Sequence, residues 1–160
     1  MIILGVDPGV ADTGYGIIKF VGNQWDCLTF GTIKTSAQLA LPQRLEIIYQ
    51  QINQLIKQFK PQLAALEQLF FCKNTKTALM VGQARGAIII ALQKNRLPLH
   101  EFTPLQIKQA VAAYGRASKI QVQKMVQLIL GLKKLPQPDD AADALAAAIC
   151  AAHSLKINSF

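Results

Sequence analysis

The stretch that decides the fold is the N-terminal "MIILGVDPGVADTGYGIIKFV", residues 1–21. Its apolar segments 1–7 and 14–21 are typical of β-strands, and "PGVADT" between them is rich in turn-forming residues. A third strand-like segment, 25–35, follows the pair "GN", which is typical of a hairpin turn. The N-terminal region is therefore predicted to form an antiparallel meander of three strands.

Helical and strand-like segments alternate along the rest of the chain. The segment 41–60 carries apolar residues at helical spacing and ends before Pro61. Further helices are predicted at 75–94, 104–113, 118–131 and 140–153, and further strands at 62–67 and 98–102. This order predicts an α/β fold in which helices flank a five-stranded mixed sheet. The length of 160 residues, without a linker-like stretch, predicts a single domain over 1–160.

Composition narrows the class of protein. A hydrophobic content of 51% is typical of a globular chain. The cysteines Cys27, Cys72 and Cys150 are far apart and form no C-x-x-C pair, which favours a reducing, cytoplasmic setting. The apolar runs are shorter than the roughly 20 residues that a membrane-spanning helix needs. We therefore expect neither a membrane span nor a secretion signal.

The positive charge of the chain is concentrated in one region. The net charge is +8, yet residues 68–138 hold eleven Lys and Arg residues against a single acid, Glu101. Solvated helix faces could carry scattered lysines, but such a one-sided excess favours a surface that binds a polyanion. Nucleic acid is the simplest partner of this kind.

Four acids stand where strands end or a helix starts. Asp7 and Glu67 end predicted strands, and Asp140 and Asp143 share one face of the last helix. A turn, a solvated strand end or the helix dipole could account for each acid alone. The helix after Asp143 is apolar all round, however, so a carboxylate there is partly buried and needs a cation. Because no Lys or Arg lies within five residues of these acids, hard divalent ions fit better.

Three motifs resemble one known family. The segments "GVDPGVADTGYGII", "EQLFFCKNTKTALMVGQARGAI" and "PDDAADALAAAIC" are similar, in order and spacing, to motifs of the RuvC family of Holliday junction resolvases. The resemblance implies an RNase H-like fold and a homodimer that cuts four-way DNA junctions in recombination and repair. It also implies two Mg²⁺ or Mn²⁺ ions per active site, hydrolysis that leaves 5′-phosphate ends, and a link to the RuvA–RuvB branch-migration complex. The catalytic and metal-binding residues that it implies are Asp7, Glu67, Asp140 and Asp143.

The resemblance also carries over residues that contact DNA. Phe70 matches a phenylalanine that disturbs base stacking at the junction, although packing in the core is its alternative role. Lys108 and Lys119 match lysines near the scissile phosphates. Further candidates for contacts to the DNA backbone are Lys73, Lys76 and Arg116.

Two acids depart from the family pattern. Asp12 lies in the loop after "DPG", where we expect a turn residue. Asp139 precedes Asp140 and is expected to cap the last helix, which favours Asp140 as the metal ligand through the D-A-A-D match. The spacing of Asp139 to Asp143 alone does not exclude the other register.

Other classes of protein and another role for one helix stay open. "VDPGVADTGYG" also resembles the phosphate loop of actin-like ATPases, although 160 residues cannot hold their two domains. A non-catalytic nucleic-acid-binding module would explain the basic region but not the four acids. For the helix 77–92, with small residues Gly82, Ala84 and Gly86, the alternatives are a dimer interface and a central core helix.

Overall fold

The computed structural model describes residues 1–22, 24–68 and 75–157. The elements follow the predicted order, with ends that differ by a few residues. The strands are β1 (Ile2–Asp7), β2 (Asp12–Val21), β3 (Gln24–Lys34), β4 (Leu63–Glu67) and β5 (Leu99–Phe102). The helices are α1 (Leu41–Phe59), α2 (Thr75–Lys94), α3 (Pro104–Ala112), α4 (Lys119–Ile129) and α5 (Asp139–Ile157).

The five strands form one mixed sheet in the order β3-β2-β1-β4-β5. The meander is confirmed, since β2 pairs antiparallel with both β1 and β3. On the side away from β2, β1 pairs parallel with β4, and β4 in turn pairs parallel with β5. The carboxyl ends of β1, β4 and β5 therefore meet at one edge of the sheet, which is where α/β sheets usually bind ligands.

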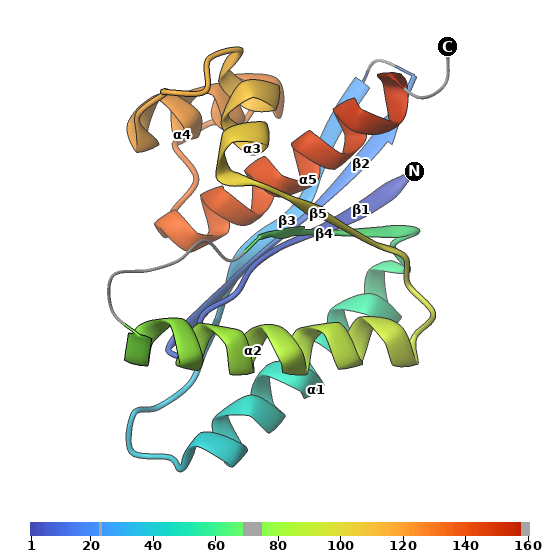
Figure 1. Ribbon diagram of the computed structural model, residues 1–160. Coiled ribbons are helices and arrows are strands. Elements are labelled where there is room, and N and C mark those ends of the chain that lie inside the picture. The colour runs from blue at the N-terminus through green and yellow to red at the C-terminus, as the bar shows by residue number, and fades with distance from the viewer. Residues whose placement is uncertain (23, 69–74, 158–160) are drawn as a thin grey trace.

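Helices cover both faces of the sheet (Figure 1). One layer contains α3, α4 and α5, and the other contains α1 and α2. Successive side chains of a strand point to opposite faces, so Ile3 packs toward α5 whereas Leu4 and Val6 pack toward α1 and α2. Within the described residues, no helix is long and apolar enough to cross a membrane.

Glycines on the central strands let α5 lie directly on the sheet. A Cβ atom at Gly5 would overlap the carbonyl oxygen of Ala144, and one at Gly14 would overlap that of Asp140. The helix is buried from Ala141 to Ala152 apart from Asp143, which is partly exposed. The prediction that this helix is covered by protein on most faces is confirmed.

The helix α2 has both a buried and an exposed apolar face. Ala84 and Ile88 are fully buried and pack in the core that α1 shares. Leu79 and Ile90 are 65% and 54% exposed, and the space where a side chain at Gly86 would lie is open. The core role proposed for this helix is therefore correct for one face, and the other face carries unpartnered apolar side chains within the described chain.

Candidate active site

The register of the parallel strands brings Asp7 and Glu67 together. Val6 pairs with Leu66, so the residues that follow them end two neighbouring strands side by side. The alternation along both strands directs these two carboxylates to the face that α5 covers, because Val6 and Leu66 pack on the opposite face. Two acids that are sixty positions apart in the chain thus share one edge of the sheet.

The first turns of α5 bring the other two acids to the same place. Gly14 is the antiparallel partner of Asp7, and the backbone of Asp140 lies directly over Gly14. Asp143 follows one turn later on the same side of the helix. The charges of Glu67, Asp140 and Asp143 all act on Asp7. The structure therefore gathers all four acids that the sequence singled out.

Burial and repulsion shift the pKa values in this cluster. Burial, together with the charges of Asp143, Glu67 and Asp140, raises the pKa of Asp7 to about 8. Burial and the charge of Asp143 raise the pKa of Glu67. The pKa of Asp143 is also raised by burial, against the lowering effect of Lys119. Three carboxyl groups held close together against their own repulsion are typical of a site that binds a cation.

Two lysines that are distant from the acids along the chain lie close to them in the structure. Lys119 Nζ lies 3.2 Å from Asp143 Oδ2. The positive charge of Lys108 acts on Glu67 and opposes the rise in its pKa that burial and Asp143 cause. Both lysines line a pocket of about 240 Å³ together with Glu67 and Asp143. The two lysines come from α3 and α4, so their distance from the acids along the chain concealed the contact. The match to family lysines was the signal that found them.

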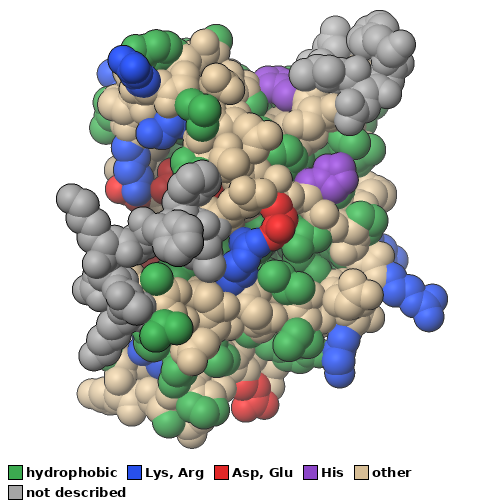
Figure 2. Space-filling view, viewed as in Figure 1, with side chains coloured by type: hydrophobic (Ala, Val, Ile, Leu, Met, Phe, Trp, Pro, Cys, Tyr) green, Lys and Arg blue, Asp and Glu red, His purple; other side chains and the backbone are tan. Residues whose placement is uncertain are grey.

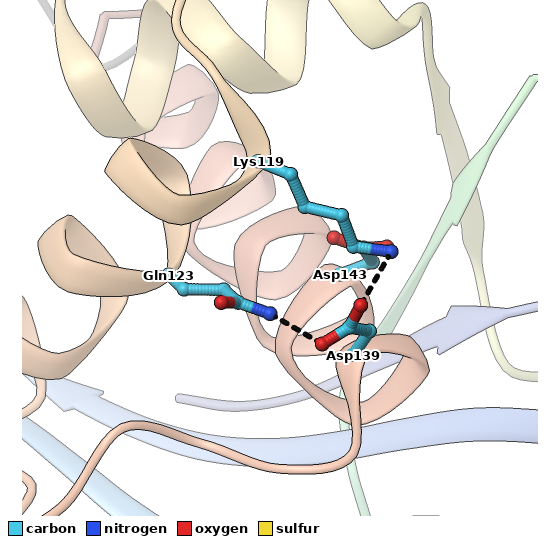
Figure 3. A network of polar contacts seen from close by, with 4 residues as sticks. All are labelled: Lys119, Gln123, Asp139 and Asp143. Atoms are coloured by element: carbon cyan, nitrogen blue, oxygen red, sulfur yellow. Dashed lines mark hydrogen bonds and ion pairs between the residues drawn. The ribbon is translucent and has the colours of Figure 1, made fainter.

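Asp139 has a role that the sequence did not predict. The helix begins at Asp139 itself, so this residue lies in the first turn rather than in the capping position before it. Its Oδ1 accepts a hydrogen bond from Gln123 Nε2 at 2.7 Å, and its Oδ2 lies 3.3 Å from Lys119 Nζ. The expected cap is therefore wrong, and Asp139 instead connects α5 to α4 (Figure 3).

A partly buried arginine holds the strand end that carries Glu67. Arg85 of α2 donates a hydrogen bond from Nη1 to the carbonyl oxygen of Glu67 at 2.9 Å, and Nη2 forms an ion pair with Glu101 of β5. Its side chain is only 14% exposed. Sequence reasoning assigned no role to Arg85, although it lies within the quoted "GQARG" motif and is the one charged residue of the mostly apolar and small-residue stretch 77–92.

The loop between β1 and β2 is tied to neighbouring elements. Thr13 Oγ1 donates to the carbonyl oxygen of Gly9, and Thr35 Oγ1 donates to that of Val10. Arg44 Nε in turn donates to Thr35 Oγ1 at 2.8 Å, which links the loop to α1. Asp12 is the first residue of β2, rather than part of the loop. These hydrogen bonds fix the backbone of the loop that follows Asp7.

Some of the candidate DNA-contacting residues lie outside the part of the chain that the structure describes. Phe70 and Lys73 lie outside the described residues, and only the backbone of Lys76, in α2, is described. Arg116 is exposed in the connection between α3 and α4. Figure 2 shows basic and acidic side chains next to one another where α4 faces the start of α5. Lys108 and Lys119 line a pocket together with Glu67 and Asp143, so these two candidates lie beside the acid cluster.

The acid cluster fits a hard divalent cation by its chemistry. All its donors are carboxylate oxygens, which Mg²⁺ and Mn²⁺ prefer. As they stand, no three acidic, histidine or cysteine side chains of the described residues are arranged as a ready-made metal site. Instead, the ammonium group of Lys119 lies against Asp143. An ion bound by Asp143 would therefore compete with Lys119 for this carboxylate.

The strand order, the two helical layers and the acids at the carboxyl ends of β1 and β4 define an RNase H-like protein. The family model "Crossover junction endodeoxyribonuclease RuvC" matches residues 3–151. The chain therefore belongs to the RuvC family of crossover junction endodeoxyribonucleases. The prediction that was based on the three motifs is confirmed.

Relatives match nearly the whole chain. The RuvC of Alkaliphilus metalliredigens is 51% identical, over 96% of this chain and 94% of its own. That of Natranaerobius thermophilus is 50% identical, over 99% of each chain. The RuvC of Thermus thermophilus, solved in complex with a Holliday junction substrate, superposes with a TM-score of 0.95 at 34% identity, covering 99% of this chain and 97% of its own. The expected RNase H-like fold is confirmed.

Proposed function

We propose that this protein resolves Holliday junctions by paired hydrolysis of phosphodiesters at a site formed by Asp7, Glu67, Asp140 and Asp143. The observation that carries the proposal is the convergence of these acids from β1, β4 and α5, with the pKa of Asp7 raised to about 8 by burial and the neighbouring charges. Proteins of the family that the chain belongs to are named for this activity, and one solved relative is bound to a Holliday junction.

The four carboxylates have the chemistry to hold two Mg²⁺ or Mn²⁺ ions. Such ions would activate a water for in-line attack and stabilise the leaving oxygen. With O3′ as the leaving oxygen, as the resemblance to the family implies, the products would carry a 5′-phosphate and a 3′-hydroxyl. The chain itself positions the carboxylates through the strand register, through Gly14 beneath Asp140, and through Arg85 on the carbonyl of Glu67. A non-catalytic DNA-binding module would have no need to hold these acids together against their repulsion.

Basic residues around the cluster are proposed to bind the DNA backbone. Lys108 and Lys119 line the pocket beside Glu67 and Asp143, where they can pair with the scissile phosphate. Arg116, exposed before α4, is suited to a contact that does not depend on sequence. The proposed contacts that lie in or next to the undescribed segment are Phe70, Lys73 and Lys76.

The protein is proposed to act as a homodimer through α2. Two symmetric cuts require two identical sites related by a two-fold axis. The exposed Leu79 and Ile90, with open space at Gly86 between them, form an apolar stripe along this helix that a second copy can cover. Sedimentation at micromolar concentration should show a dimer for the wild type and a monomer for Leu79→Glu. A monomeric wild type, with and without junction DNA, would contradict the proposal.

We further propose the cytoplasm as the place of action and the RuvA–RuvB complex as a partner, both on the resemblance to the family. Cys27 and Cys150 are free, which suits a reducing compartment.

A junction-cleavage assay tests the function and the site together. The wild type should cut a labelled four-way junction in Mg²⁺ but leave linear duplex and ATP unchanged. Asp140→Asn and Asp143→Asn should each lower the cleavage rate by at least about 100-fold, because each removes a metal-binding charge, while a gel shift still detects junction binding. Loss of binding in parallel with cleavage would assign these acids a structural role. Hydrolysis of ATP with an intact junction would favour the actin-like ATPase alternative.

A further inference from the structure

The first turn of α5 and the first turn of α4 are joined by one polar network (Figure 3). Lys119 and Gln123 lie one turn apart on α4 and both reach Asp139. Gln123 is 3% exposed, and its amide donates to Asp139 Oδ1 at 2.7 Å. Asp139 is therefore held by a buried side chain even though it lies at the surface.

Lys119 is shared between two carboxylates of unequal role. Its ammonium lies 3.2 Å from Asp143 and 3.3 Å from Asp139. Asp143 belongs to the cluster that is proposed to bind metal, whereas Asp139 is exposed and its carboxylate oxygens are occupied by Gln123 and Lys119. When Asp143 turns toward an ion, its attraction for Lys119 falls. Asp139 is then the acid that can keep the ammonium in place.

Without such a partner the lysine would lose its position. Its side chain is 53% exposed and ends a flexible four-carbon stem, so little else restrains it. The position of the Lys119 side chain is important because it lines the pocket next to Glu67 and Asp143, where the scissile phosphate is proposed to lie. A second carboxylate at the rim of this pocket can therefore keep the cation aimed at the phosphate.

We propose that Asp139, oriented by Gln123, is a positioning residue that holds Lys119 beside the active site once Asp143 is engaged by metal. The inference rests on the proposed catalytic site and goes beyond it, because Asp139 stands outside the D-A-A-D motif. It contacts neither substrate nor ion and acts only through Lys119.

A double-mutant cycle on junction cleavage tests the proposal. Asp139→Asn keeps the shape of the side chain and an oxygen for Gln123 but removes the charge. It should lower kcat by about 2- to 5-fold, as expected for one exposed ion pair, with KM unchanged or lower. In a Lys119→Ala background the same change should have no further effect. Glu46→Gln, which removes an exposed acid from α1, is the control for net charge and should leave kcat at the wild-type value.

A second readout follows the lysine itself rather than turnover. Acylation of Lys119 by an amine-reactive reagent, mapped by mass spectrometry in Mg²⁺ without DNA, should be about 2- to 5-fold faster in Asp139→Asn than in the wild type. Gln123→Met should give a smaller increase, and Glu46→Gln none. Melting temperatures of all variants check that folding is preserved.

The outcomes separate this inference from the proposed site. If Lys119→Ala cleaves slowly but Asp139→Asn behaves like Glu46→Gln in both assays, the positioning role is wrong and the proposed site stands. An equal loss from Asp139→Asn with and without Lys119 would also overturn it, because Asp139 would then act directly. If Lys119→Ala cleaves at the wild-type rate, the proposed role of the lysine fails together with this inference.

Discussion

Replacing Asp7 by Asn should change how the stability of the metal-free protein depends on pH. The pKa of Asp7 rises from 3.8 to about 8 on folding, first because of burial and then because of the charges of Asp143, Glu67 and Asp140. Between these two values the folded state holds a proton that the unfolded state has released. The free energy of unfolding of the wild type should therefore fall as the pH rises through this window.

The size of the change in unfolding free energy follows from the width of this pH range. At 1.36 kcal/mol per pH unit, one proton held only by the folded state corresponds to about 4 kcal/mol between pH 5 and pH 8. The Asn variant carries no proton at this position and removes one charge from the cluster. We expect Asp7→Asn to gain about 2–4 kcal/mol relative to the wild type over this range, since neighbouring acids can take over part of the proton binding.

Urea unfolding in EDTA at pH 5, 6, 7 and 8 measures this difference. Asp26→Asn, which alters an exposed acid on β3, is the matched control and should run parallel to the wild type. Adding Mg²⁺ at pH 8 should restore much of the lost stability to the wild type but not to Asp7→Asn, because a bound ion replaces the proton. Parallel curves for the wild type and Asp7→Asn in EDTA would refute the reasoning.

Three further predictions concern the residues that hold or surround the site. Gly14→Ala should destabilise the protein by about 1–3 kcal/mol in urea and abolish cleavage, since the new methyl group meets the backbone of α5; unchanged stability would contradict this close packing. Arg85→Met should cost about 1–3 kcal/mol and slow cleavage, because the carbonyl of Glu67 loses its donor; unchanged cleavage would argue against this role. Arg116→Ala should lower the salt dependence of junction binding by about one phosphate contact, and an unchanged slope would exclude that contact.

Local periodicity and register determined much of this structure in advance. The apolar segments and the turn-forming residues between them predicted the meander, and helical spacing predicted the helices to within a few residues. The strand-end positions of Asp7 and Glu67, and the spacing of the acids in the last helix, marked candidates, and the D-A-A-D match favoured Asp140 over Asp139. These features depend on backbone geometry that repeats every two or 3.6 residues, so a short segment contains the information.

The partners of the acids depended on how separate elements dock. Lys119 approaches Asp143 because α4 packs against α5, and Arg85 approaches Glu67 because α2 crosses beneath the sheet. Asp139 was expected to cap its own helix, since capping is the strongest local role for such a residue, but a buried Gln123 on another helix binds it instead. The sequence by itself determined the elements and marked the four candidate acids, because each depends on neighbouring residues of the chain. Only the tertiary structure decided which cations and which amide face those acids, because contacts between helices depend on the packing of α5 onto the glycines of the sheet.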